Sequence, residues 1–208
     1  MQKEARVREQ YDHLAEKYDL RWRDYVSSTL SFLKKWMAVK GTERILDVAC
    51  GTGTLEQLLV KDHPNQNISG IDISERMLAV AKRKLAVYPN VTFFNASASE
   101  IPFPEESFDR VVCASSFHFF DDPTRSLREM RRVLKTGGSV IILDWCRDYL
   151  ICRLCDLCLR LFDPAHKQCY SQDELHRFLS EIGLHAVKEK KFKINLAWGM
   201  MIAEAVKT

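Results

Sequence analysis

A carboxylate and two glycines lie close together where a short apolar run gives way to a helical pattern. Residues 45–48 form an apolar run of the kind that fills a buried parallel strand, and leucines recur at helical spacing over 55–59. Gly51 and Gly53 therefore occupy a turn between a strand and a helix, where the backbone can approach a ligand closely. Asp47 would repel an anionic phosphate and attract an ammonium or sulfonium cation. The segment predicts a site for a small nucleoside-bearing ligand, although paired glycines also occur in plain helix-entry turns.

This turn lacks the features of the two commonest phosphate-binding loops. Glu56 stands where the dinucleotide fingerprint G-x-G-x-x-G would have its third glycine, and no Lys-Ser or Lys-Thr pair follows the glycines. A pyrophosphate is therefore disfavoured at the start of the helix. A nicotinamide-dependent oxidoreductase on a related sheet is disfavoured for the same reason.

A second carboxylate follows one unit downstream. Residues 68–74 have the pattern of a strand that ends in Asp72, and an acid about twenty residues beyond such glycines is placed to bind a ribose. An ionised carboxylate only accepts hydrogen bonds, so it can take both ribose hydroxyls. Ser74 then caps a helix that we expect over 75–86. The alternative is that Asp72 serves only as a capping or turn aspartate, and the sequence leaves both roles open.

Together these segments resemble the class I methyltransferases that use S-adenosylmethionine, and the order of the later segments agrees. The similar segments are 91–109 (third strand, adenine loop and the approach to the next strand), 110–118 (fourth strand), 122–138 (a helix with a glycine C-cap), 139–144 (fifth strand), and 186–194 with 199–206 (a final antiparallel pair). The resemblance covers residues 8 to 206 and is to the small-molecule, ubiquinone/menaquinone-methyltransferase-like branch. It implies an α/β fold: a doubly wound, seven-stranded, mostly parallel sheet with one antiparallel strand and helices on both faces.

The resemblance also implies which residues bind the cofactor, S-adenosylmethionine. At the matching positions stand Tyr11, Tyr18, Asp47, Ala49, Cys50, Gly51, Gly53, Asp72, Ile73, Met77, Ser97, Ala98, Cys113 and His118. Two of them depart from the family pattern. Ala49 replaces the usual first glycine of the loop, and Ser97 replaces an aspartate that usually accepts the adenine amino group. Asn95 or Ser99 is available to supply that missing contact.

The implied reaction is a single in-line methyl transfer, for which the protein aligns the nucleophile and excludes water. A general base is needed only when the acceptor is a weakly acidic hydroxyl or a carbon acid. We rank His118 first as a catalytic residue, because it is expected just after the fourth strand, then Asp144 at the end of the fifth strand, then His166. The alternative for His118 is a histidine packed among the neighbouring phenylalanines.

Two segments are expected to cover the site. Residues 1–40 resemble a helical cover over the cofactor, and Tyr11 and Tyr18, seven residues apart, would share one helix face. Either both rings pack on the sheet, or one closes over the methionine end of the cofactor as a cation–π partner. Residues 145–170 are expected to form a helical insertion over the acceptor site. The 208 residues, 46% of them hydrophobic, suit a single domain over 1–208.

The seven cysteines have two interpretations. Cys152, Cys155 and Cys158 have the C-x-x-C-x-x-C spacing of an iron–sulfur ligand set. Leucines at helical spacing in the same window, with no glycine or proline, favour a helix on which the cysteines are small apolar residues flanking the leucines. We therefore expect no metal site. The sequence shows no signal peptide or membrane span, so we expect a cytoplasmic protein whose thiols are reduced.

The net charge of the chain bears on whether it binds nucleic acid. The 31 basic and 28 acidic residues nearly balance to a net charge of +3, which argues against a nucleic-acid partner. The basic run 188–193 has the pattern of the solvated side of an edge strand. The expected function is methyl transfer to a small-molecule acceptor by a monomer or homodimer. The alternative is a non-catalytic S-adenosylmethionine- or S-adenosylhomocysteine-binding protein or assembly subunit, which would have the same cofactor motifs.

Overall fold

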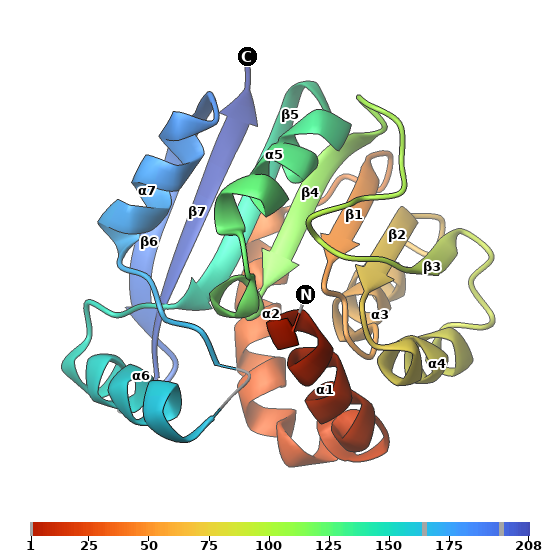
Figure 1. Cartoon of the computed structure of the whole chain (residues 1–208). Coiled ribbons are helices and arrows are strands. Elements are labelled where there is room, and N and C mark those ends of the chain that lie inside the picture. The colour runs from red at the N-terminus through yellow and green to blue at the C-terminus, as the bar shows by residue number, and fades with distance from the viewer. Residues whose placement is uncertain (1, 164–165, 196–197) are drawn as a thin grey trace.

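Seven strands form one sheet in the order β3-β2-β1-β4-β5-β7-β6 (Figure 1). The computed structural model describes residues 2–163, 166–195 and 198–208. The strands are β1 (Arg44–Val48), β2 (Asn67–Asp72), β3 (Val91–Asn95), β4 (Phe108–Ala114), β5 (Leu134–Trp145), β6 (Leu184–Lys193) and β7 (Gly199–Lys207). Strand β7 runs antiparallel to both of its neighbours, and every other adjacent pair is parallel. The predicted mostly parallel sheet with one antiparallel strand is confirmed.

Helices cover both faces of the sheet and the end at which the parallel strands finish (Figure 1). They are α1 (Gln2–Arg21), α2 (Arg23–Met37), α3 (Thr54–Asp62), α4 (Glu75–Lys84), the short 3-10 helix η1 (Phe117–Phe119), α5 (Pro123–Val133), α6 (Leu150–Phe162) and α7 (Gln172–Glu181). Buried residues of α5 and α7 share one core cluster with the sheet, and those of α2, α3 and α4 share the other. Apolar strands buried on both faces are what such a doubly covered sheet requires.

Local signals set several helix ends as predicted. The Ser74 hydroxyl accepts a hydrogen bond from the Met77 N–H and caps α4. Ser171 and Glu174 form the expected capping box at the start of α7. None of the helices in the described part of the chain is long and apolar enough to cross a bilayer.

Two expectations about the middle of the chain are wrong. Gly137 and Gly138 do not cap a helix: α5 ends at Val133, and both glycines lie in β5 where its pairing with β4 shifts register. A Cβ on Gly138 would lie 2.7 Å from the Asp109 carbonyl oxygen, so the close approach of the two strands requires a glycine there. His118 does not extend the fourth strand either, because β4 ends at Ala114 and His118 lies on η1.

The orientation of α6 also differs from the interpretation of its sequence. The predicted helix is present, but its leucines are exposed, whereas Cys152 and Asp156 are buried. Cys152 therefore does not merely flank a packed leucine stripe. It shares the inward side of the helix with Asp156, whereas Cys155 is half-buried and the exposed Cys158 lies on the outward side with the leucines.

Candidate functional site

The turn between β1 and α3 contains three residues with positive φ. Ala49 (φ 62°), Gly51 (φ 56°) and Gly53 (φ 74°) all lie in the left-handed region, which costs a non-glycine residue roughly 1–2 kcal/mol. The Cys50 N–H donates to the Ile71 carbonyl oxygen at 3.0 Å, which holds the turn against the end of β2. The alanine at position 49 thus adopts the conformation for which a glycine would be the unstrained choice.

Asp72 connects this turn to the next one. Its Oδ2 accepts from the Gly51 N–H at 2.9 Å, and its Oδ1 accepts from the Ser74 N–H at 2.8 Å. Burial raises the pKa of Asp72, and these backbone hydrogen bonds oppose the rise. Asp72 therefore fills the turn-aspartate role left open by the sequence, and it also lines the cavity described below.

Helix α1 covers the turn between β1 and α3, and hydrogen bonds to two aspartates of the helix, Asp12 and Asp19, hold it there. The Ser74 hydroxyl donates to Asp12 at 2.5 Å, and the Thr52 hydroxyl donates to Asp19 at 2.5 Å. The Lys84 ammonium also binds Asp19, at 2.6 Å. These contacts tie α1 to the starts of both α3 and α4 and to the last turn of α4. The sequence analysis missed both aspartates.

Tyr11 and Tyr18 lie on one face of α1, as their spacing predicted. Their ring centres are 6.0 Å apart, and the Tyr11 ring meets the Phe119 ring edge-on at 5.6 Å. Burial raises the pKa of Tyr18 to about 12 and the pKa of Tyr11 well above its usual value, so both phenols are neutral. Both tyrosines line the cavity beneath α1.

This cavity has a volume of about 350 Å³, within the range of small-molecule sites. It lies under α1 and α2, at the ends of β1, β2 and β4. Eleven of the residues predicted to bind a cofactor line it: Tyr11, Tyr18, Asp47, Ala49, Cys50, Gly51, Asp72, Ile73, Met77, Ser97 and Ala98. Lining residues that the sequence analysis missed include Tyr25, Thr29, Thr52, Ser115, Phe119 and Arg125.

Three residues expected at the cofactor are absent from the lining of this cavity. A Cβ on Gly53 would lie 3.0 Å from both Ala81 and Leu85, so this glycine lets α3 start close against α4. Cys113 is fully buried within β4. His118 points into a separate polar cluster, described below. Gly53 lies in the predicted turn and Cys113 in the predicted strand, where both serve packing, whereas His118 lies beyond the strand, on η1.

One carboxylate in the lining of the cavity, Asp47, interacts electrostatically with a second buried acid, Glu56. Asp47 is 3% exposed and Glu56 is fully buried, and in the described structure neither Glu56 oxygen has a hydrogen-bond donor. Burial raises the pKa of Asp47 well above its usual value, with the Glu56 charge adding to the rise, and raises the pKa of Glu56 to about 7. Two like charges in a buried site disfavour each other, so one of the two carboxyl groups keeps its proton.

Stability should therefore depend on the protonation of Glu56. A raised folded-state pKa means that the stabilisation is complete below the unfolded value of 4.5 and is lost as pH rises through about 7. We expect Glu56→Gln to gain stability relative to wild type between pH 5 and pH 8, by roughly 3 kcal/mol at most. Chemical denaturation at both pH values measures this. The exposed Glu181→Gln is the matched control, and an equal effect of Glu56→Gln at both pH values would contradict the assignment.

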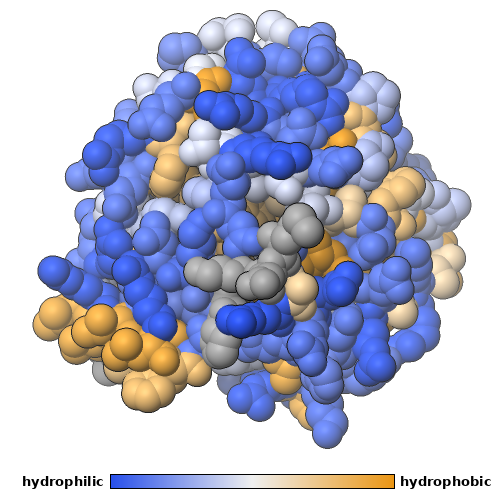
Figure 2. All heavy atoms as spheres, in the orientation of Figure 1, coloured by the Kyte–Doolittle hydropathy of each residue, from blue (hydrophilic) through white to orange (hydrophobic). Residues whose placement is uncertain are grey.

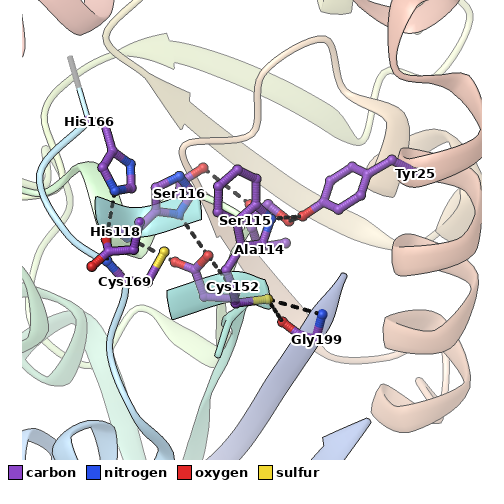
Figure 3. Close-up of polar contacts among 12 residues, drawn as sticks. Tyr25, Ala114, Ser115, Ser116, His118, Cys152, His166, Cys169 and Gly199 are labelled. Carbon is purple, nitrogen blue, oxygen red and sulfur yellow. Dashed lines mark hydrogen bonds and ion pairs between the residues drawn. The ribbon is translucent and has the colours of Figure 1, made fainter. Parts of the chain in front are cut away.

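His118 (labelled in Figure 3) and Asp144 form a buried pair beside the cavity. The Asp144 carboxylate binds the His118 ring Nδ1 at 2.7 Å and accepts from the His118 backbone N–H at 2.8 Å. Trp145 stacks on the imidazole with ring centres 4.9 Å apart. The centre of the Phe119 ring, which lines the cavity, lies 4.0 Å from the centre of the His118 ring. The two top-ranked catalytic candidates are thus in direct contact, a pairing that the sequence did not predict.

His166, the third candidate, belongs to an adjoining cluster. Its ring centre is 5.7 Å from that of His118, and its Nε2 is 2.8 Å from Asp156 Oδ1. The Cys169 N–H donates to the same Asp156 oxygen, and Arg160 binds the other at 2.7 Å. Potential metal-donor atoms of Asp156, His166 and Cys169 lie within 4.8 Å of one another. Because the aspartate already binds a guanidinium and two N–H groups, we interpret this cluster as the anchor of α6.

Comparisons with known proteins agree with this geometry. Residues 45–138 match the model of a methyltransferase domain. A demethylmenaquinone methyltransferase from Bacillus cytotoxicus is 30% identical, with 94% of each chain covered. This chain therefore belongs to the class I S-adenosylmethionine-dependent methyltransferases.

Two further comparisons agree. A demethylmenaquinone methyltransferase from Thermotoga maritima is 37% identical over 64% of this chain, but the match spans only 59% of that relative. Among solved structures, the complex of the Haloferax volcanii Trm112 methyltransferase activator with its methyltransferase partner matches with a TM-score of 0.82. It is 18% identical, with 94% of this chain and 96% of that chain covered. At this identity the structural match supports the fold alone.

The cavity of this class I methyltransferase has features that fit S-adenosylmethionine, which supplies a methyl group on a sulfonium. A Cβ on Gly51 would meet nothing within 4 Å, so the loop backbone borders open space. Asp47 Oδ1 is buried without a hydrogen-bond donor, as a cationic ligand group would require. In this arrangement Asp72 would bind the ribose, Asp47 would face the cationic amino-acid end, and Ser97 with Ala98 would border the adenine. Ser97 bonds Ser99 at 2.9 Å, so a hydroxyl pair occupies the position of the family's aspartate.

Proposed function

We propose that this methyltransferase transfers the methyl group of S-adenosylmethionine, held beneath α1, to a small apolar ring acceptor held between α2 and η1. The observation that carries the proposal is the cavity itself, which joins a carboxylate-lined end at Asp47 and Asp72 to an aromatic end at Tyr25 and Phe119. One end suits the charged cofactor and the other suits an apolar acceptor.

The aromatic end is supported by a hydrogen-bonded framework (Figure 3). The Tyr25 hydroxyl is 2.8 Å from the Ser115 hydroxyl and accepts from the Trp145 indole N–H at 2.8 Å. The Trp198 ring packs on both aromatic rings, with its centre 6.0 Å from that of Tyr25 and 4.6 Å from that of Trp145. These contacts fix flat surfaces against which a ring can stack. The two curated relatives are both named demethylmenaquinone methyltransferases, which supports a quinone-type ring as the acceptor class.

We assign His118, whose ring adjoins that of Phe119 in the lining of the aromatic end, as the general base and Asp144 as the residue that positions it. Asp144 binds Nδ1, so Nε2 is the ring nitrogen that can take a proton from the acceptor. Asp144 is 1% exposed and its oxygens bind His118 and the Trp145 N–H, so it acts through the histidine. Methylation of a ring carbon or a hydroxyl requires loss of a proton, and the His118–Asp144 pair would remove that proton.

We also infer a cytoplasmic location. All seven cysteines are free thiols in the structure, which supports a reducing compartment.

Turnover of defined acceptors tests the function. The protein would be incubated with S-adenosylmethionine and a short-chain demethylmenaquinol, alongside small amines, thiols, phenols and carboxylates, with S-adenosylhomocysteine formation as the readout. We expect the quinol to be methylated fastest. Turnover only of a different class would reject the acceptor. Tight S-adenosylhomocysteine binding with no turnover of any class would instead support the non-catalytic alternative.

The ribose contact makes a separate prediction. Asp72→Ala should weaken S-adenosylhomocysteine binding by about 1.5–3 kcal/mol, roughly 10- to 150-fold, because hydrogen bonds to a charged acceptor are lost. Isothermal titration measures the dissociation constant, and thermal unfolding checks the fold, since Asp72 also binds two backbone N–H groups. Asp62→Ala, on the far end of α3, is the matched control. An unchanged dissociation constant in Asp72→Ala would remove this residue from the cofactor site.

A further inference from the structure

The outward side of α6 is an exposed apolar surface at one corner of the molecule (Figure 2). Its large side chains are exposed by 44% to 82% of their area. They are Leu150, Ile151, Leu154, Leu157, Leu161 and Phe162, and the exposed Cys158 lies among them. We call this set the α6 surface. Clustered exposure of this kind marks an interaction site, whereas isolated exposed leucines do not.

The opposite side of α6 is fixed to the protein, so the exposure follows from a defined orientation. The Gly199 N–H donates to Cys152 Sγ at 3.2 Å (Figure 3), and Asp156 binds both His166 and the Cys169 N–H. A buried aspartate and a buried cysteine thus define the inward side. Rotating the helix to bring the leucines inward would break these contacts and leave Asp156 without its hydrogen-bond donors.

Most of the charges around the α6 surface are cationic, and the acid at its C-terminal end is the half-buried C-cap Asp163. Arg153 and Arg160 are both exposed, and Arg160 also forms an ion pair with the buried Asp156. Because they are seven residues apart on a helix, both lie along one border of the leucine stripe. Lys193 lies 5.5 Å from the ring centre of Tyr149, directly before the helix. The acid at that end, Asp148, is paired with Lys191 at 2.9 Å.

We propose that the α6 surface docks on an anionic lipid bilayer, with the helix lying in the plane of the interface. A helix of 13 residues is about 20 Å long, too short to span a bilayer, and it combines an apolar stripe with bordering cations. The leucines and Phe162 enter the headgroup boundary, and Arg153, Arg160 and Lys193 meet lipid phosphates. A protein partner would need no such cationic border. This inference does not depend on the acceptor proposed above.

Vesicle co-sedimentation tests the docking. Full-length protein would be mixed with vesicles of phosphatidylcholine alone or with phosphatidylglycerol added. We expect binding to the anionic vesicles that weakens with salt. The partition coefficient should be at least about tenfold lower for Leu154→Glu/Leu157→Glu, because two exposed leucines that would enter the bilayer are lost. Leu20→Glu/Val87→Glu, at two other exposed apolar side chains, is the matched control and should bind as wild type does.

A label distinguishes docking through α6 from other attachment. Cys158 is the exposed thiol among the seven, so an environment-sensitive dye placed there in a Cys155→Ser background should shift to the blue on anionic vesicles. Circular dichroism and S-adenosylhomocysteine binding of the variants check folding without any vesicle. Absence of vesicle binding by wild type, or equal loss in the control pair, would overturn the proposal. A concentration-dependent dimer abolished only by Leu154→Glu/Leu157→Glu would assign the α6 surface to a second copy of this chain instead.

Discussion

Replacing Gly51 with valine is expected to abolish S-adenosylmethionine binding in a protein that still folds. A Cβ at this position meets nothing within 4 Å and borders the cavity, so a branched side chain would fill space that the ligand needs. The φ of 56° adds strain, because β-branched residues avoid the left-handed region. We expect the dissociation constant for S-adenosylhomocysteine, measured by isothermal titration, to rise by at least about a hundredfold, as loss of several contacts with the loop would produce.

A second glycine separates the loss of space from the backbone strain. Gly137 also has positive φ (79°) and open space around its Cβ, but it lies in β5 and does not line the cavity. Gly137→Val should therefore lower the unfolding temperature and leave cofactor affinity unchanged. Retained affinity in a folded Gly51→Val protein, or an equal loss in Gly137→Val, would show that the loop does not border the cofactor.

Replacing His118 with alanine is expected to lower the methyl-transfer rate by roughly a hundredfold or more, the usual contribution of a positioned base. S-Adenosylhomocysteine affinity should hardly change, because the His118 ring adjoins Phe119 at the aromatic end of the cavity, away from the carboxylate end at Asp47 and Asp72. Asp144→Asn should also slow turnover, because it weakens the orientation and the charge stabilisation of the imidazole.

The control for His118 is His176→Ala, which removes an exposed histidine that contacts Glu189 on the surface. If His118 only fills the core, its variant should be less stable but keep its turnover per folded molecule. A rate within a few fold of wild type, measured on folded protein, would reject the general base. The reaction would then depend on an acceptor that ionises in solvent.

Features set by nearby residues were predictable from the sequence. The Ser74 cap and the capping box at Ser171 each depend on contacts within a few residues, and the structure has both. The glycines of the turn at 49–53 have the positive φ that this residue type favours. The pairing of Tyr11 with Tyr18 follows from helical spacing alone. Eleven predicted cofactor residues line the cavity because consecutive parallel strands end at the same edge of the sheet.

Features set by distant contacts were missed. Asp19 binds Thr52 across 33 residues, and His118 meets Asp144 across 26, so neither spacing signals the contact. Glu56 was interpreted only as a missing glycine, although its burial against Asp47 gives the cavity a proton-holding pair. On α6, periodicity located the leucine stripe but could not show which side of the helix faces the core, because the inward side is held by polar contacts.

A crystal structure of the protein grown with S-adenosylhomocysteine would locate the cofactor directly. We expect one ligand in the cavity beneath α1, with its ribose hydroxyls on the Asp72 carboxylate, its amino group toward Asp47 and its sulfur toward the aromatic end at Tyr25 and Phe119. Ligand density elsewhere, or a ligand in this cavity whose ribose makes no contact with Asp72, would show that the cofactor does not bind as proposed.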